Sequence, residues 1–200
     1  MKRNPITRNL AILLFDEVEV LDFAGPFEVF SVTGLRDKIK PFHVYTVSME
    51  SAPVIARNGL SINAHYTIAD CPRADILLIP GGYGTRPLLK DTAALNWIRE
   101  TSEAAEMTLS VCTGALLLAK AGLLTDMEAT THHGSLDFLG ELDPTITVRS
   151  ETRFVDNGAF ILSAGVSAGI DMSFHVVKRL LGKEHAAETA HYMEYEHFSG

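Results

Sequence analysis

Short apolar segments bounded by turn residues recur along the chain. Several of them are apolar at consecutive positions, which is typical of strands that are covered on both faces in a parallel sheet. They are also rich in Val, Ile and Leu, the side chains that favour buried strands. The pattern predicts strands at residues 10–15, 42–48, 75–80, 107–111 and 159–165.

Helical patterns alternate with these strands. Residues 91–106 place apolar positions on one side and charges on the other, whereas 113–124 is apolar nearly all round and is expected to be buried. A helix over 168–182 is predicted to stop at Gly182, and a last helix covers 184–196. A further helix is expected at 27–32, after Pro26, because proline is tolerated in a first helical turn.

Two segments interrupt the alternation. The segment around Asn58-Gly59 predicts a small hairpin or extended ladder, and Asn157-Gly158 predicts a two-residue hairpin turn. Strand-helix alternation elsewhere is typical of a doubly wound α/β sheet with helices on both faces. We find no repeat, low-complexity tract or linker, so residues 1–200 are expected to form one domain.

Charge and composition narrow the class of protein. The chain has 200 residues, a formal net charge of -8 and 46% hydrophobic residues. An acidic balance without basic clusters argues against nucleic acid as a partner. The N-terminal apolar stretch is too short for a signal or a membrane span, so we expect a cytoplasmic protein without membrane contact. Its two cysteines, Cys71 and Cys112, are expected to be free thiols.

Cys112 stands where a predicted strand ends and an apolar helix begins. Thr113, Gly114 and Ala115 are small enough to allow a sharp turn that lifts the cysteine out of the sheet, as in a nucleophile elbow. Amide N–H groups at the helix start favour the thiolate and can hold negative charge on an intermediate. The alternative is a small hydrophobic residue packed in the core. Cys71, in a loop before a proline, is interpreted as structural.

Two further loops carry candidate chemistry. Gly81 and Gly82 follow a buried strand, and if they lie against Cys112, the N–H groups of Gly82 and Thr113 form an oxyanion hole; the alternative is a tight turn. Asp22 follows the first strand and either caps a helix or is buried beside the thiol. In the second case one member of the pair keeps a proton, which suits an acid/base partner.

Other polar residues have weaker signals. His132 and His133 follow a probable strand end; His132 is a candidate for the substrate-binding site, and the role of His133 stays open. Glu188 and His191 have the spacing of half a metal site, but without a second copy we expect a solvated helix face and no metal. Ser167 is a natural helix N-cap.

At these loops the sequence resembles the ThiJ/PfpI superfamily, relatives of the class I glutamine amidotransferase domain. The matching segments are "LLFDEVEVLDFAGPFEVF", "DILLIPGGYGT", "LSVCTGALLLAKAGLLTDMEATTHH" and "FILSAGVSAGIDMSFHVVKRLLG", which span nearly the whole chain. The resemblance implies a flavodoxin-like fold, a homodimer, Cys112 as elbow nucleophile, Asp22 as the acid facing the sulfur, and Thr113 beside it. It is strongest for the isonitrile hydratase subgroup and the ligand-sensing halves of some AraC-type regulators.

Departures from other subgroups narrow the expected reaction. Many hydrolases and deglycases of the superfamily have histidine after the cysteine and a glutamate near the thiol, where this chain has Thr113 and Asp22. The resemblance therefore implies a lyase that hydrates isonitriles to N-substituted formamides through a Cys112 thioimidate, with a small electrophile as substrate and no cofactor. The alternative is a cysteine redox or stress sensor, or a ligand-sensing protein of the same superfamily.

Overall fold

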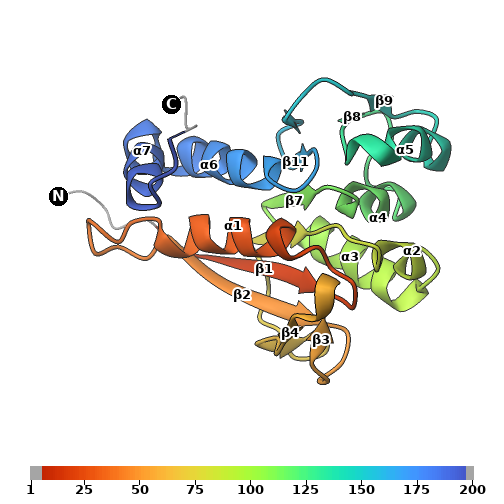
Figure 1. The fold of residues 1–200 in the computed structure, drawn as a ribbon, viewed down its shortest axis with the longest axis horizontal. Helices are drawn as coiled ribbons and strands as arrows, with labels where there is room; N and C mark the ends of the chain where they lie inside the picture. The colour runs from red at the N-terminus through yellow and green to blue at the C-terminus, as the bar shows by residue number, and fades with distance from the viewer. Residues whose placement is uncertain (1–5, 197–200) are drawn as a thin grey trace.

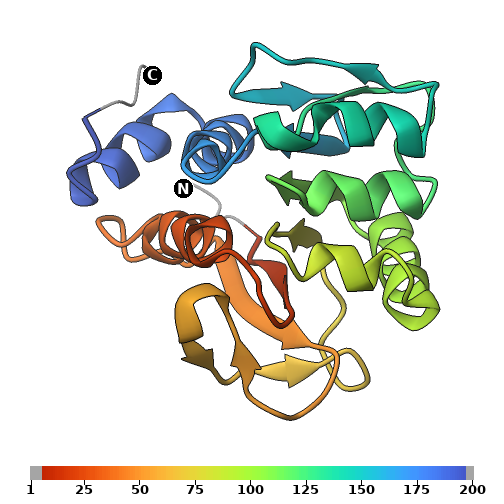
Figure 2. The same cartoon turned by 45° about the vertical axis from the view of Figure 1, so that its right-hand side comes forward.

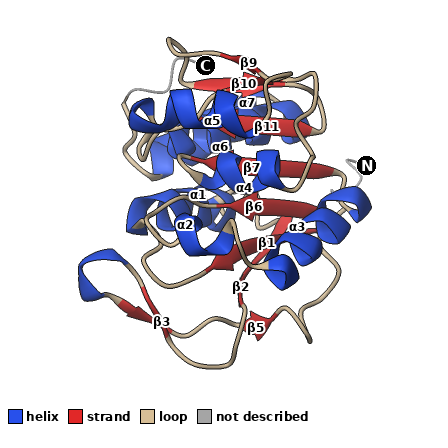
Figure 3. Cartoon of the chain, turned by 90° about the vertical axis from the view of Figure 1, so that its right-hand side faces the viewer, coloured by secondary structure: helices blue, strands red, loops and turns tan. Residues whose placement is uncertain are grey.

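The computed structural model describes residues 6–196, in which a seven-stranded sheet lies between two layers of helices (Figures 1 and 2). All neighbouring strands run parallel except one antiparallel pair at an edge of the sheet. In spatial order the strands are β10 (Phe154–Asp156), β11 (Phe160–Ser163), β7 (Met107–Val111), β6 (Ile76–Ile79), β1 (Arg8–Leu14), β2 (Phe42–Ser48) and β5 (Tyr66–Thr67). Figure 3 shows this order, with β10 near one end and β5 at the other.

The helices divide between the two faces of the sheet. One layer consists of α1 (Val20–Val32), α6 (Ala168–Leu181) and α7 (Lys183–Tyr192), which contact one another. The other consists of α2 (Thr85–Leu88), α3 (Thr92–Ala104), α4 (Gly114–Lys120) and α5 (Leu136–Leu142). Two small ladders are added, β3 (Val54–Ile55) with β4 (Ser61–Ile62) and β8 (Glu128–Ala129) with β9 (Thr147–Val148). Short 3-10 turns cover Arg57–Gly59 and His133–Ser135.

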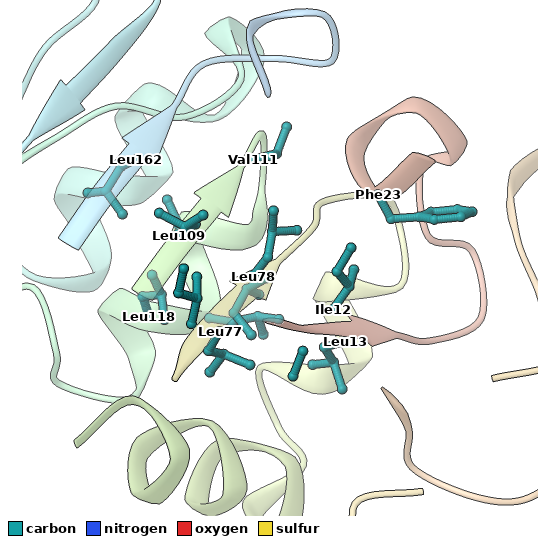
Figure 4. Close-up of a cluster of buried hydrophobic side chains, with 14 of the residues drawn as sticks. Ile12, Leu13, Phe23, Leu77, Leu78, Leu109, Val111, Leu118 and Leu162 are labelled. Carbon is teal, nitrogen blue, oxygen red and sulfur yellow. The ribbon is translucent and has the colours of Figure 1, made fainter. Parts of the chain in front are cut away.

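The core consists of the strands' own side chains and the helix faces that cover them. Ile12, Leu78 and Leu109, on adjacent strands, are fully buried, and Figure 4 shows their side chains within one apolar cluster. Burial on both faces explains the consecutive apolar positions, because each side of a strand meets a helix layer. Removal of this much apolar surface from water is the main favourable contribution to folding.

The structure confirms the predicted doubly wound sheet and both hairpin positions. The helix expected after Pro26 is wrong in its start, since α1 begins at Val20 and contains Pro26 in its interior. The apolar helix expected over 113–124 ends at Lys120. Ser167 stands at the N-cap of α6 but makes no side-chain cap bond; its hydroxyl accepts from Arg153 instead.

Two expectations concern the limits of the chain. The single domain predicted over 1–200 includes residues 1–5 and 197–200, which lie outside the described residues, and its extent stays a prediction. Within 6–196, every helix is too short or too polar to cross a lipid bilayer.

Parallel pairing brings four loops to one edge of the sheet. β1, β6, β7 and β11 all end there, so the segments after them come together although they are far apart in sequence. Loops at the carboxyl ends of parallel strands are where ligands bind in open α/β sheets. Gly81 and Gly82 follow β6, Cys112 and Thr113 follow β7, Asp22 lies in the first turn of α1, and His132 follows β8.

Candidate active site

Cys112 occupies a sharp turn between β7 and α4. Its backbone has a φ of 56°, in the left-handed region that non-glycine residues rarely adopt. The turn is held on both sides, because the Cys112 N–H donates to Ala164 O at 3.0 Å and the Thr131 hydroxyl donates to Cys112 O at 2.7 Å. Such strain persists only where the surroundings enforce it, and it concentrates at functional sites. The nucleophile-elbow geometry expected from the sequence is therefore present.

Gly114 makes this turn possible. A Cβ at Gly114 would lie 2.1 Å from the carbonyl oxygen of Ile79, at the end of the neighbouring strand. Only a residue without a side chain lets α4 begin this close to β6. The small residues after Cys112 are thus explained by backbone packing.

Asp22 is buried in α1 and does not cap the helix. Its side chain is fully inaccessible, and its Oδ2 accepts a hydrogen bond from the Gly81 N–H at 2.9 Å. The other oxygen, Oδ1, is buried without a partner of normal hydrogen-bond geometry among the described residues. Burial raises the pKa of Asp22 to about 7, the Gly81 N–H opposes the rise, and a hydrogen bond with the Cys112 thiol opposes it further.

The Cys112 thiol is the partner of this carboxyl. Burial, and after it the negative charge of Asp22, raise the pKa of Cys112 to about 12. The N–H groups of Thr113 and Val166 act on the sulfur in the opposite direction. The Thr113 N–H at the helix start favours the thiolate, as expected, but desolvation and Asp22 outweigh the two amides, so the resting thiol is protonated. Above about pH 7 the pair keeps one proton, located mainly on the sulfur, and below this pH Asp22 is protonated as well.

The glycine loop abuts the elbow, as the oxyanion-hole hypothesis requires, but its amides have other partners. The Gly82 N–H donates to Thr113 Oγ1 at 2.9 Å, and the Gly81 N–H donates to Asp22. The oxyanion hole predicted from the N–H groups of Gly82 and Thr113 is therefore wrong for Gly82, whose N–H is bonded to Thr113. The N–H groups that face the sulfur belong to Thr113 and Val166.

Gly81 and Gly82 instead let their loop pack closely against the backbone of the segment before α1 and against Asp22. A Cβ at Gly82 would lie 2.3 Å from the carbonyl oxygen of Glu17, and one at Gly81 would lie 2.8 Å from Asp22 Oδ2. The loop is pinned to the segment before α1 by a hydrogen bond from the Glu19 N–H to Gly81 O at 2.9 Å. This contact holds the acid at a defined place beside the thiol.

His132 lies at the same cavity as Cys112. The cavity has a volume of about 360 Å³, and its lining includes Gly82, Cys112, Thr113 and His132. Burial lowers the pKa of His132, and the neighbouring His133 lowers it further, so the ring is neutral at physiological pH. Its Nδ1 accepts from the Gly134 N–H at 3.2 Å, which leaves the proton on Nε2 as a free donor.

Seven lining residues were not among the predicted site residues: Glu19, Arg57, Tyr83, Arg86, Gly134, Ser135 and Val166. Val166 has a φ of 48°, an outlier for a β-branched residue, in the second strand-to-helix turn after β11. Arg57 lies in the 3-10 turn between β3 and β4, Tyr83 in the loop before α2, and Arg86 in α2. The sequence signal for Val166 was its place among small residues before a helix.

The remaining candidates lie elsewhere. Cys71 is a free, half-buried thiol in a loop on the far side of β2. Glu188, half-buried in the middle of α7, lies near His185 and Asp37 rather than pairing with His191. His133 is exposed and packs against His132 with the two rings tilted and their centroids 4.1 Å apart.

The sequence is similar to that of known proteins. A sequence model of the DJ-1/PfpI family matches residues 8–179. The chain is 34% identical over 187 residues to an isonitrile hydratase from Pseudomonas putida, covering 93% of this chain and 78% of the relative. It is also 30% identical to the HTH-type transcriptional regulator CdhR from Pseudomonas aeruginosa over 80% of this chain, and it spans about half of that regulator, 51%.

Solved structures agree on the fold. A ThiJ/PfpI family protein from Pseudomonas syringae superposes with a TM-score of 0.87 at 29% identity, covering 96% of this chain and 77% of that one. Drosophila melanogaster DJ-1beta superposes with a TM-score of 0.80 at 17% identity, covering 94% of this chain and 98% of that one. The flavodoxin-like architecture expected from the resemblance is thereby confirmed.

Proposed function

The chain belongs to the DJ-1/PfpI family, and we propose that this member is a cysteine-dependent lyase that hydrates isonitriles to N-substituted formamides. The similarity to an isonitrile hydratase supports the reaction class. The observation that carries the proposal is the buried pair of Asp22 and Cys112, which holds one proton between an acid and a nucleophile at the edge of a cavity.

The first half of the reaction uses that proton. The Asp22 carboxylate takes the thiol proton, and the thiolate adds to the terminal carbon of the isonitrile, forming a C–S bond. Asp22 then returns the proton to the same carbon, which gives a neutral thioimidate. Because the acid and the sulfur exchange one proton, the resting thiol is no obstacle; the thiolate forms only as substrate arrives.

The second half adds water. Asp22 accepts a proton from the water molecule that attacks the thioimidate carbon and passes this proton to the substrate nitrogen. The hydroxyl of the adduct then gives its proton to Asp22 as the C–S bond breaks, Asp22 returns the proton to the sulfur, and the formamide leaves. The N–H groups of Thr113 and Val166 offset charge on the sulfur in both halves, and His132 Nε2–H is available to the substrate nitrogen.

The raised pKa of Cys112 bears on the alternative of a redox sensor. Peroxides react with thiolates, and a thiol whose pKa is about 12 is a poor spontaneous target near neutral pH. A ligand-sensing role has support from the similarity to a transcriptional regulator. A lyase and a ligand sensor differ in whether the bound molecule is converted to product.

The test is formamide production from a neutral alkyl isonitrile such as cyclohexyl isonitrile, followed by chromatography. We expect turnover by the wild type, none with Cys112→Ala, and a reduction of about 10²- to 10⁴-fold with Asp22→Asn. Cys71→Ser removes the other thiol and is expected to keep full activity. Hydration that survives in Cys112→Ala would refute the proposal, as would a wild type that binds isonitriles without converting them.

A further inference from the structure

We propose that the cavity selects isonitriles that carry an anionic group, such as a carboxylate, and that Arg86 binds this group. The inference rests on the proposed hydratase function and adds the class of substrate. It follows from the charged residues that line the cavity and from whether each of them has a partner of opposite charge.

Arg86 is the cation of the lining that has no acidic partner. It projects from α2, and its Nη2 donates to Ser135 Oγ at 3.2 Å, while its guanidinium carbon lies 5.2 Å from the ring centroid of Phe138. Both partners are uncharged, and Arg86 forms no ion pair with any carboxylate in residues 6–196. The side chain is therefore oriented while its charge stays available.

Arg57 differs from Arg86 in this respect. Its Nε lies 3.5 Å from Glu19 Oε2, and its guanidinium carbon lies 3.8 Å from the ring centroid of Tyr83. The charges of Arg57 and Glu19 offset each other, and both residues line the cavity. Arg57 and Glu19 together add no net charge to the cavity lining.

The other ionisable residues of the site do not neutralise Arg86. Above about pH 7 the pair of Asp22 and Cys112 keeps one proton and carries one negative charge, but Asp22 is fully buried, accepts from the Gly81 N–H and forms no ion pair with Arg86. His132 is neutral, because its pKa is lowered. Arg86 is therefore the one cation of the cavity lining without an ion-pair partner among the described residues, and a guanidinium binds a carboxylate through two parallel hydrogen bonds.

The volume of the cavity fits this assignment. About 360 Å³ is near the lower end of the range for small-molecule sites. Cys112 and Arg86 both line this cavity, so a substrate whose isonitrile carbon lies at the sulfur can direct a carboxylate toward the guanidinium. A neutral substrate of the same length leaves the guanidinium without a partner.

The test compares two substrates that differ only in charge, 2-isocyanoacetate and its methyl ester. We expect the wild type to convert the acid with a kcat/KM about ten- to a hundredfold above that of the ester, the range that a charged hydrogen bond provides. Arg86→Gln is expected to bring this ratio close to one, and Arg86→Lys to restore part of it. Added salt is expected to lower the ratio, since ions screen an exposed charge.

Lys90→Gln is the matched control. Lys90 is an exposed cation just beyond α2 and is not part of the cavity lining, so its removal changes the net charge equally and should leave the ratio unchanged. A wild type that converts acid and ester equally, or an Arg86→Gln variant that keeps the preference, would overturn the inference.

A binding experiment separates this inference from the proposed function. N-formylglycine, the hydration product of 2-isocyanoacetate, and its methyl ester are titrated into wild type and Arg86→Gln by calorimetry. If the acid binds more tightly than the ester only when Arg86 is present, the anion site is supported even where no isonitrile is hydrated. If isonitriles are hydrated but neither preference is found, the hydratase function stands and the anion site is refuted.

Discussion

Replacement of Asp22 by asparagine is expected to make the protein more stable above neutral pH while it removes most of the proposed activity. The change preserves the size of a side chain that is fully buried in α1. The amide oxygen of asparagine can still accept from the Gly81 N–H, which Asp22 Oδ2 accepts at 2.9 Å. The variant therefore differs from the wild type mainly in that it cannot become a buried anion.

The magnitude follows from the pKa of Asp22. Burial raises that pKa from 3.8 to about 7, so the folded protein holds a proton that the unfolded chain releases. The contribution of Asp22 to stability is complete below the unfolded pKa and is lost as the pH rises through the folded one. The shift of about three units corresponds to a loss of about 4 kcal/mol, of which roughly 2–3 kcal/mol falls between about pH 5 and about pH 8.

Urea denaturation of wild type and Asp22→Asn at about pH 5 and about pH 8 measures this difference. We expect the two proteins to differ little at the lower pH and the variant to be more stable by roughly 2–3 kcal/mol, relative to that baseline, at the higher pH. Glu103→Gln, an exposed position on α3, is the control for loss of a carboxylate and should follow the wild type. An identical pH dependence in wild type and Asp22→Asn would refute the reasoning.

Three further predictions test the elbow. The rate at which iodoacetamide alkylates Cys112, measured by peptide mass spectrometry, should rise about tenfold per pH unit up to about pH 10, because burial and Asp22 hold the pKa of the thiol at about 12. A rate that reaches a plateau near neutral pH would contradict this pKa. Gly114→Ala should unfold the protein or lower its free energy of unfolding by more than about 3 kcal/mol, because the new Cβ would lie 2.1 Å from a backbone carbonyl oxygen. The control, Gly122→Ala, places its Cβ in open space and should lower the free energy of unfolding by only about 1 kcal/mol. Similar shifts in melting temperature for both variants would refute the packing argument. Thr131→Val should lose about 1–3 kcal/mol in thermal denaturation because it leaves the buried Cys112 carbonyl without its 2.7 Å hydrogen bond, and an unchanged melting temperature would show that this bond does not hold the turn.

The sequence by itself determined the layers of the protein and the place of its nucleophile. Consecutive buried positions such as Leu77, Leu78 and Ile79 predicted strands covered on both faces, because a local run of apolar side chains reflects burial directly. The small residues after Cys112 predicted a sharp turn for an equally local reason, since a short chain segment carries its own steric limits. Pro26 was misleading because packing of α1 on the sheet overrides a local preference for the first turn.

Only the tertiary structure decided the protonation of the site and the partners of its amides. The pKa of Cys112 depends on how deeply the sulfur is buried and on Asp22, which approaches it from another strand end. Gly82 appeared free to bind substrate, yet its N–H is used by Thr113, and Val166 supplies the amide in its place. The lack of an ion-pair partner for Arg86 could not be inferred from the sequence, because an unmatched charge is recognisable only when every neighbour is known. These properties arise from contacts between segments that are distant along the chain, and no local pattern encodes such contacts.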